Sequence, residues 1–566
     1  MKYENGILYH SSFLFHNQKP TLPMKTDFTI EGNFVDIRQR SIYPARLVIS
    51  NGKVRNIRRL TGTKSRYILP GFIDAHVHIE SSMLVPTEFA KIAVLHGTVA
   101  TVSDPHEIAN VLGTEGVWYM IENGRKSPLK FNFGAPSCVP ATVFETAGAE
   151  VTHEDIAHLL ASPEVRYLAE MMNWPGVIFD DPSVQHKLDI AKRAGKPIDG
   201  HAPGLIGKQA LKYISKGIST DHECYMIDEA RFKLKNGMKV IIREGSAAKN
   251  FDTLAPLISK YFEQMMFCSD DKHPDDLLEG HINLLVKRAV ARGIDVFKVL
   301  QMACINPVEH YGLDVGTTQV GDWADLIIVD NLTDFNVLKT YINGDVVSER
   351  GRDYIKTQPE RIINNFNISA KKPSDFASPL TKIDINIIEV LDKQLITRIF
   401  EGKISLENGL ATPSVSDDIL KIAVVNRYAD APVATAFIKN FGLKRGAIAS
   451  SVAHDSHNII AVGVSDEAIC EAVNALIAYK GGLSATDGVL TEVLPLPIAG
   501  LMSNESAEIV AQKYTALVNM ARDLGSTLTS PFMSLSFMAL LVIPRLKLSD
   551  KGLFDGEKFV FCPIER

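Results

Sequence analysis

Two histidines spaced by one residue, His76 and His78, stand at the end of the apolar run YILPGFIDAHVHIE. Successive side chains of a β-strand point to opposite faces, so both imidazoles would point to the same side. Two neutral histidine nitrogens can hold one divalent metal ion. A single His-x-His motif is weak evidence for a metal site, because many such motifs are incidental. The residues at the ends of the other apolar runs therefore decide how this motif is interpreted.

The ends of four further apolar runs carry side chains of the same chemical kind. These are Glu170 in VRYLAEMMN, His201 in KPIDGHAPG, His222 in KGISTDHEC and Asp270 in QMMFCSDDKHP. Together with the first pair they offer four imidazoles and two carboxylates, enough for two metals about 3.5–4 Å apart with one bridging carboxylate. The alternative is a set of hydrogen-bonded polar residues that cap strands. Six ligand-type side chains at run ends favour a binuclear metal centre.

The elements that must position these residues are eight short β-rich runs. They are YILPGFIDAHVHIE, GTVATVSDPHE, LKFNFGAPSCVP, VRYLAEMMN, KPIDGHAPG, KGISTDHEC, MKVIIREG and QMMFCSDDKHP. The segments between them, such as PTEFAKIAVLHG and DPSVQHKLDIAKRAG, have the three- and four-residue apolar spacing of helices. Eight βα units predict an α/β fold, a (β/α)₈ TIM barrel over residues 66–309, with its active site at the carboxyl ends of the strands.

The two segments that flank the predicted barrel, residues 1–65 and 310–355, have the pattern of β-structure. Both alternate apolar and polar residues, and they contain the Asn-Gly turns Asn51-Gly52 and Asn343-Gly344. Asn-Gly between alternating segments is typical of β-hairpins. We expect both flanks to form one small β-sandwich domain. Residues 370–566 mix strands and helices and predict a C-terminal α+β domain.

Composition fits a folded enzyme. The chain has 566 residues, 46% hydrophobic and 22% charged, which is enough for two to four domains. Its formal net charge is −6, and the lysines and arginines are scattered, so no basic stripe indicates nucleic-acid binding.

The sequence also indicates a cytoplasmic protein without a membrane partner. No stretch approaches 18 uninterrupted apolar residues, and the first residues, MKYENGILYHSSFLFHN, lack the pattern of a signal peptide. The six cysteines contain no C-x-x-C pair, which argues against a disulfide framework and against a thiolate zinc site.

Several strings resemble known families. PGFIDAHVHIE resembles the first-strand signature of the amidohydrolase superfamily, and INPVEHYGLDVGTTQVGDWADLIIVD resembles its return into the flanking β-domain. SDPHEIANVLG, MMNWPGV, GHAPGL, STDHEC, CSDDKHP and SSVAHDSHNI resemble the adenine deaminase family within it, over nearly the whole chain. Many binuclear amidohydrolases bridge their metals with a carboxylated lysine on the fourth strand, but the fourth run here contains no lysine. The resemblance implies that Glu170 is the bridge.

This resemblance implies hydrolytic deamination of adenine to hypoxanthine and ammonia in purine salvage. It implies two divalent metals, manganese or iron, while the donor set is also compatible with zinc. The metal ligands would be His76, His78, Glu170, His201, His222 and Asp270. We also expect a homo-oligomer, a dimer or larger.

Four acidic or imidazole side chains are candidates for catalysis or substrate binding. Asp270 would take a proton from the attacking water and pass it to the departing amino group. Glu223 would protonate or hydrogen-bond a ring nitrogen, and the alternative is a solvated loop acid. Asp104 and His106 end the second run, where side chains can line the substrate pocket.

The sequence does not decide the role of a polar cluster in the last region, and it is compatible with two rival functions. The resemblance suggests that the segment of His454, Asp455 and His457 closes over the barrel mouth, although a helix-cap or surface role is as plausible. One rival function is another amidohydrolase, acting on a cyclic amide or an N-acyl substrate, because a barrel with a metal site does not fix the substrate. The other rival is a catalytically dead relative that serves as a scaffold.

Overall fold

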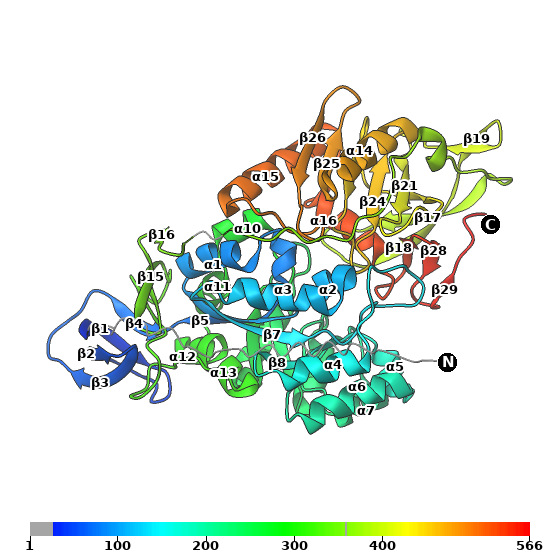
Figure 1. The fold of residues 1–566 in the computed structure, drawn as a ribbon. Coiled ribbons are helices and arrows are strands. Elements are labelled where there is room, and N and C mark those ends of the chain that lie inside the picture. Colours follow the sequence, from blue (N-terminus) through cyan, green and yellow to red (C-terminus); the bar gives the residue numbers. More distant parts are fainter. Residues whose placement is uncertain (1–26, 357–358) are drawn as a thin grey trace, which may run out of the picture.

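A computed structural model describes residues 27–356 and 359–566 of the chain (Figure 1). All eight predicted runs contain a strand, and these strands run parallel with the order of the sequence. They are β5 (Phe72–Val77), β6 (Thr98–Ser103), β7 (Lys130–Ala135), β8 (Val165–Met171), β9 (Ile198–Gly200), β10 (Thr220–Asp221), β11 (Lys239–Arg243) and β12 (Met265–Cys268). The predicted (β/α)₈ barrel is therefore confirmed.

Two seams close the barrel. The amide of Ser219, just before β10, donates to Ile198 O of β9 at 2.9 Å, and the amide of Asp270, just after β12, donates to His76 O of β5 at 3.0 Å. The strands are buried along most of their length, as expected of parallel strands covered on both faces. The second seam places the end of the last strand beside the histidine pair of the first.

Helices follow every barrel strand. They are α1 (Pro86–Leu95), α2 (His106–Leu112), α3 (Thr114–Gly124), α4 (His153–Ala161), α5 (Trp174–Ile178), α6 (Pro182–Arg193), α7 (Gly207–Ser215), α8 (Ile227–Lys235), α9 (Phe251–Tyr261), α10 (Pro274–Glu279), α11 (Ile282–Ala291), α12 (Val296–Leu300) and α13 (Asn306–Tyr311). Helices α1 and α6 are those predicted from apolar spacing. Proline at the first helical position, as in both of these helices, has no amide to leave unpaired and favours helix initiation.

The two flanks of the barrel meet in one eight-stranded sheet (Figure 1). It contains β1 (Phe28–Asp36), β2 (Ser41–Ser50), β3 (Lys53–Arg59), β4 (Tyr67–Pro70), β13 (Leu326–Val329), β14 (Val337–Ile342), β15 (Asp345–Glu349) and β16 (Arg352–Asp353). The two Asn-Gly turns join β2 to β3 and β14 to β15, with positive φ at both residues of each turn. The first run thus supplies two strands, since YILP pairs in this sheet as β4 and FIDAHV enters the barrel as β5.

The last third of the chain forms a second eight-stranded sheet with helices. Its order is β18-β17-β22-β21-β24-β23-β25-β26, and a small sheet of β27, β28 and β29 lies beside it. The bounds are β17 (Asp384–Val390), β18 (Thr397–Lys403), β21 (Ile419–Val425), β22 (Ala434–Lys439), β23 (Ala447–Ser450), β24 (Ile459–Gly463), β25 (Gly482–Thr486), β26 (Thr491–Pro495), β27 (Leu546–Ser549), β28 (Gly552–Asp555) and β29 (Val560–Phe561). Its longer helices are α14 (Asp466–Tyr479) and α15 (Ala507–Asp523), followed by α16 (Pro531–Ser536) and the short turn η5 (Phe537–Ala539).

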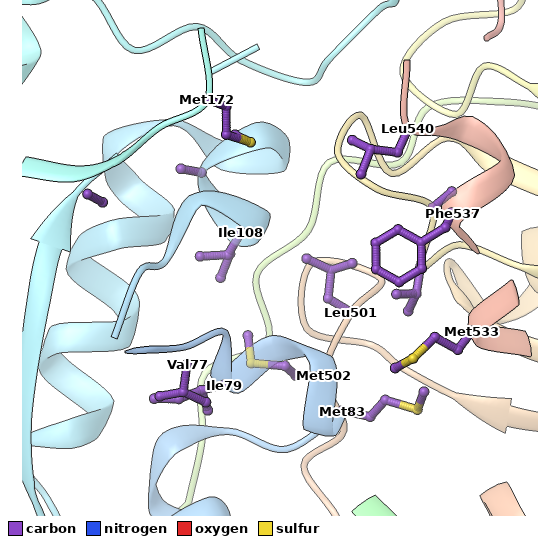
Figure 2. Packing of buried hydrophobic residues seen from close by; sticks show 14 of the residues in the cluster. Val77, Ile79, Met83, Ile108, Met172, Leu501, Met502, Met533, Phe537 and Leu540 are labelled. Carbon is purple, nitrogen blue, oxygen red and sulfur yellow. The ribbon is translucent and has the colours of Figure 1, made fainter. Parts of the chain in front are cut away.

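This C-terminal domain packs against the mouth of the barrel. One buried apolar cluster runs across the contact, and Figure 2 shows Val77, Ile79 and Ile108 of the barrel opposite Leu501, Met533 and Phe537. A backbone hydrogen bond of 2.8 Å from Ser503 N to Met83 O adds to the contact. Because the cluster is continuous, the carboxyl ends of the barrel strands are covered by the C-terminal domain.

The described part of the chain contains no helix that is long and apolar enough to cross a membrane. The segment MKYENGILYHSSFLFHN, from which we predicted that no signal peptide is present, lies outside the described residues.

Candidate metal centre

The six predicted metal ligands come together at the carboxyl ends of the barrel strands. Each lies at or just after the end of its strand, and each is buried, with exposed fractions of 8% or less. Asp270 has a φ of 53°, in the left-handed region that non-glycine residues seldom adopt. Strain of this kind is found where the surrounding structure needs one particular side-chain direction. The Asp270 carboxylate faces His76 and His78 with one oxygen and Arg243 with the other.

Glu170 lies at the centre of the cluster, and its two oxygens face different histidines. Oε1 lies 3.3 Å from His78 Nε2 and 3.9 Å from His76 Nε2. Oε2 lies 2.6 Å from His201 Nδ1 and 3.3 Å from His222 Nε2. Two ligands of one metal, each about 2.0–2.2 Å from it, lie roughly 3 Å apart. The spacing around each oxygen is therefore that of ligands able to share a cation.

The histidine pair of the first strand also faces Asp270. Its Oδ1 lies 3.3 Å from His78 Nε2 and 3.7 Å from His76 Nε2, and the two Nε2 atoms lie 3.1 Å apart. His78 Nδ1 lies 3.1 Å from the carbonyl oxygen of Asp104. A carbonyl only accepts, so Nδ1 carries the proton and Nε2 of the neutral ring has a free lone pair. This orientation fits a metal ligand.

Both carboxylates of the cluster are ionised. Burial raises the pKa of Glu170, but His201 and His222 more than offset it and hold that pKa well below its usual range. Burial acts in the same direction on Asp270, and there the Arg243 guanidinium does most to hold the pKa well below its usual range. Two anionic and four imidazole ligands, without a thiolate, suit divalent manganese, iron or zinc.

A second set of polar groups fixes the first strand against the last. Asp74 Oδ2 lies 2.7 Å from His281 Nε2, and His281 Nδ1 lies 2.7 Å from Thr98 Oγ1. The amide of Ser269 donates to Asp74 Oδ1 at 3.0 Å. Hydrogen bonds of this kind behind the ligands orient metal sites in proteins. His281, the residue just before α11, has no neighbouring motif that would have predicted this role from the sequence.

Glu223 is buried in an ion pair and is not a solvated loop acid. Arg243 Nη2 donates to Glu223 Oε2 at 2.9 Å, and Arg243 Nη1 contacts Glu223 Oε1 and donates to Asp270 Oδ2 at 2.8 Å. The sequence analysis did not identify Arg243, although it is the last residue of strand β11 in the seventh run, because an arginine is not a metal ligand. The arginine joins the two predicted catalytic carboxylates.

The other two predicted pocket residues have different positions. His106 lines the cavity above the metal ligands, with Nδ1 3.4 Å from Glu170 Oε1. Asp104 lies behind it, where Oδ2 is 3.0 Å from His106 Nδ1 and Oδ1 accepts from the His106 amide at 3.1 Å. The structure therefore places His106 at the cavity and Asp104 as the group that orients it.

The C-terminal polar cluster is buried against the barrel. Glu107, which follows His106, accepts from His454 Nδ1 at 2.5 Å and contacts His457 Nε2. The amide of Ala453 donates to His457 Nδ1 at 3.2 Å, so Nε2 carries the proton and donates to the carboxylate. Asp455 is 3% exposed and lines the cavity together with His454. The segment covers the barrel mouth and has neither a surface role nor a helix-cap role.

Besides His454 and Asp455, the C-terminal domain contributes an apolar surface to this cavity. It is formed by Leu395, Phe537, Leu540 and Ile543 of the C-terminal domain, which we call the apolar wall. Phe537 stacks on the His454 ring, with centroids 4.4 Å apart and an angle of 16° between the planes. A second cavity, of about 490 Å³, shares Glu223, Arg243, Leu395 and Ile543 with the metal cavity. These four residues therefore lie between the two cavities.

Comparisons with known proteins agree with this architecture. A model of the amidohydrolase family matches residues 67–347, and a model of the adenine deaminase C-terminal domain matches residues 394–560. An adenine deaminase of Salinibacter ruber is 52% identical over 541 residues, which cover 95% of this chain and 99% of that protein. This chain belongs to the adenine deaminase family.

Two further adenine deaminases extend the likeness across distant organisms. Those of Borreliella burgdorferi and Methanosarcina mazei are 51% and 50% identical, and each alignment covers 94% of this chain. The alignments cover 99% and 98% of those adenine deaminases. Membership of the amidohydrolase family implies a divalent metal site, and the buried cluster of histidines and carboxylates fits one.

Proposed function

We propose that this protein hydrolyses adenine to hypoxanthine and ammonia. The observation that carries the proposal is the position of Glu170, whose two oxygens each face a different pair of histidines. Such an arrangement supports a bridging carboxylate without a lysine carbamate. The names of the relatives, adenine deaminases at about half identity over nearly the full length, supply the substrate.

Six side chains would hold two divalent metals, manganese or iron. His76, His78 and Asp270 would surround one position, His201 and His222 the other, and Glu170 would span both. Metals bound there would lower the pKa of a water molecule from about 15.7 towards about 7, so that hydroxide forms at neutral pH. The two ionised carboxylates offset part of the metal charge.

The chain's own groups would handle the protons of the reaction. Asp270 would accept the proton of the attacking water and deliver it to the amino nitrogen of adenine as the C6–N bond breaks and ammonia leaves. Arg243 holds the other Asp270 oxygen, so that one oxygen stays directed at the cluster. Glu223 would give a proton to a ring nitrogen of the base as hydroxide attacks C6, so that the negative charge developing on that nitrogen is neutralised, and the proton of the new C6 hydroxyl would replace it on Glu223.

Two broader properties belong to the same proposal. The six cysteines of the chain are free thiols in the structure, which supports a reducing compartment such as the cytoplasm. The homo-oligomeric state stays a prediction, which size-exclusion chromatography with light scattering tests directly.

The substrate assignment is tested by ammonia release from a panel of purines and pyrimidines, using manganese-loaded protein. We expect adenine to react fastest and adenosine to be poor, because its ribose must fit a pocket shaped for a free base. Faster turnover of adenosine or cytosine would contradict the assignment. Turnover of cyclic amides or N-acyl compounds alone would favour another amidohydrolase, and an inactive protein without metals would favour the scaffold.

A further inference from the structure

The apolar wall is built from two segments that are far apart in the sequence. Leu395 lies in the loop before β18, whereas Phe537, Leu540 and Ile543 lie in η5 and the turn that follows it. Neither segment is part of a regular sheet at these positions, so the ladder of a β-sheet does not hold them. The shape of the wall must come from other contacts.

One buried lysine joins the two segments. Lys547, in β27, is fully buried, and its Nζ donates to Leu395 O at 2.7 Å and to Phe537 O at 2.8 Å. Among the residues that the structure describes, no acidic side chain pairs with it. Both carbonyls belong to residues of the apolar wall, so a single amine fixes the backbone of the wall at two points.

The chemistry of this amine suits its position. An ammonium buried without a counter-ion is unfavourable, and burial lowers the pKa of Lys547 to about 7. A neutral amine has two N–H groups, which match the two carbonyl acceptors. The contact therefore satisfies the buried amine and both buried carbonyl oxygens.

The apolar wall and the metal ligands line the same cavity, the wall from the C-terminal domain and the ligands from the barrel. Phe537 stacks on His454, and His454 hydrogen-bonds Glu107, the neighbour of His106 on the barrel. A planar heteroaromatic base next to Glu170 and Asp270 has two apolar faces, and an aromatic ring with aliphatic neighbours is the surface that such faces bind. The polar edge of the same base would meet Glu223 and His106.

We propose that the apolar wall is the base-binding surface of this enzyme and that Lys547 is the positioning residue that holds it in place. This inference rests on the proposed adenine substrate. It assigns recognition of the base to the C-terminal domain and the metal chemistry to the barrel.

The test compares Lys547→Met with Lys421→Met. Lys421 is a matched control, because it is also a buried lysine of the C-terminal domain, but it bonds Phe376 O and Asp466 away from the cavity. We expect Lys547→Met to raise KM for adenine at least about fivefold, the scale of a lost aromatic contact, with kcat within about twofold and metal content unchanged. Lys421→Met should leave KM within about twofold of wild type.

Two direct changes to the wall support the test if Lys547→Met does not fold. Phe537→Leu and Leu395→Ala should raise KM in the same way while both metals stay bound. Hypoxanthine affinity, measured by calorimetry on metal-loaded protein, should fall in parallel and does not depend on turnover. Wild-type protein that binds hypoxanthine but leaves adenine unchanged would contradict the proposed function alone.

Two results would overturn the role of the wall. One is an unchanged KM and hypoxanthine affinity in Phe537→Leu and Leu395→Ala. The other is an equal rise of KM in Lys547→Met and Lys421→Met, which would reduce Lys547 to a general stabilising residue.

Discussion

The two sides of the active-site cavity are built in different ways. On the barrel side, six ligand-type side chains stand at the ends of regular strands, and strand pairing fixes their backbone. On the opposite side, the apolar wall lies on loops of the C-terminal domain and is held by Lys547 and by aromatic stacking. Metal chemistry tolerates little displacement of its ligands, whereas an apolar surface need only present the right shape. The difference predicts separate effects on kcat and KM.

The largest effect should come from Glu170→Gln. An amide brings no charge to offset two dications, so the variant should lose at least one metal. The loss of activity should exceed the ~10²–10⁴ that a single acid-base group contributes. Metal analysis and ammonia release measure both quantities.

Glu170 also leads to a prediction about how the metal centre assembles. Because Glu170 needs no carbamylation, metal loading of apo-protein should be equally complete in CO₂-depleted and bicarbonate-supplemented buffer. Bicarbonate-dependent loading, or two tightly held metals in Glu170→Gln, would show that the bridge is a different residue.

Asp270→Asn should lower kcat by roughly 10²–10⁴, or more if a metal is lost, because the proton acceptor is removed. The fold should persist, since the backbone hydrogen bond from Asp270 to His76 does not involve the side chain. Circular dichroism and metal analysis are the controls. Near-wild-type activity in the metal-replete variant would exclude the proton-transfer role.

Glu223→Gln should have a smaller effect, a loss of about 10–10² in kcat/KM, because the amide can still hydrogen-bond the ring nitrogen but cannot give it a proton. The Arg243 contact limits the disturbance, since the amide oxygen can still accept from the guanidinium. Wild-type rates in Glu223→Gln would show that the ion pair between Glu223 and Arg243 has only a structural role.

The smallest effect is on stability and concerns the wall alone. Burial lowers the pKa of Lys547 from 10.5 to about 7, so between these pH values the unfolded chain binds a proton that the folded chain has lost. The free energy of unfolding should therefore rise with pH across this window, by at most about 1.4 kcal/mol per pH unit. This contribution should be missing in Lys547→Met and present in Lys421→Met, as measured by urea unfolding at pH 7 and pH 9. Equal pH dependence in wild type and Lys547→Met would contradict it.

The barrel side of the cavity could be predicted from the sequence because each ligand is indicated by the short apolar run that it ends. Apolar runs ending in ligand-type residues indicate strands, and parallel strands bring their carboxyl ends to one place. The structure accordingly brings His76, Glu170 and Asp270 together, although they are up to 194 residues apart in the chain.

The wall could not be predicted in this way. Leu395, Phe537 and Lys547 have no shared motif, and their contact depends on how two loops pack across the C-terminal domain. Arg243 is an intermediate case, because its place at a strand end was visible and only its chemical type fell outside the metal-ligand pattern.

The central claim is that the barrel carries out the metal chemistry and that the apolar wall binds the base. It is tested most directly by the rate of ammonia release as a function of adenine concentration, measured for metal-replete Asp270→Asn and Phe537→Leu in parallel. The account predicts that Asp270→Asn lowers kcat with little change in KM, and that Phe537→Leu raises KM with little change in kcat. A Phe537→Leu enzyme that loses kcat at unchanged KM, or that loses a metal, would contradict it.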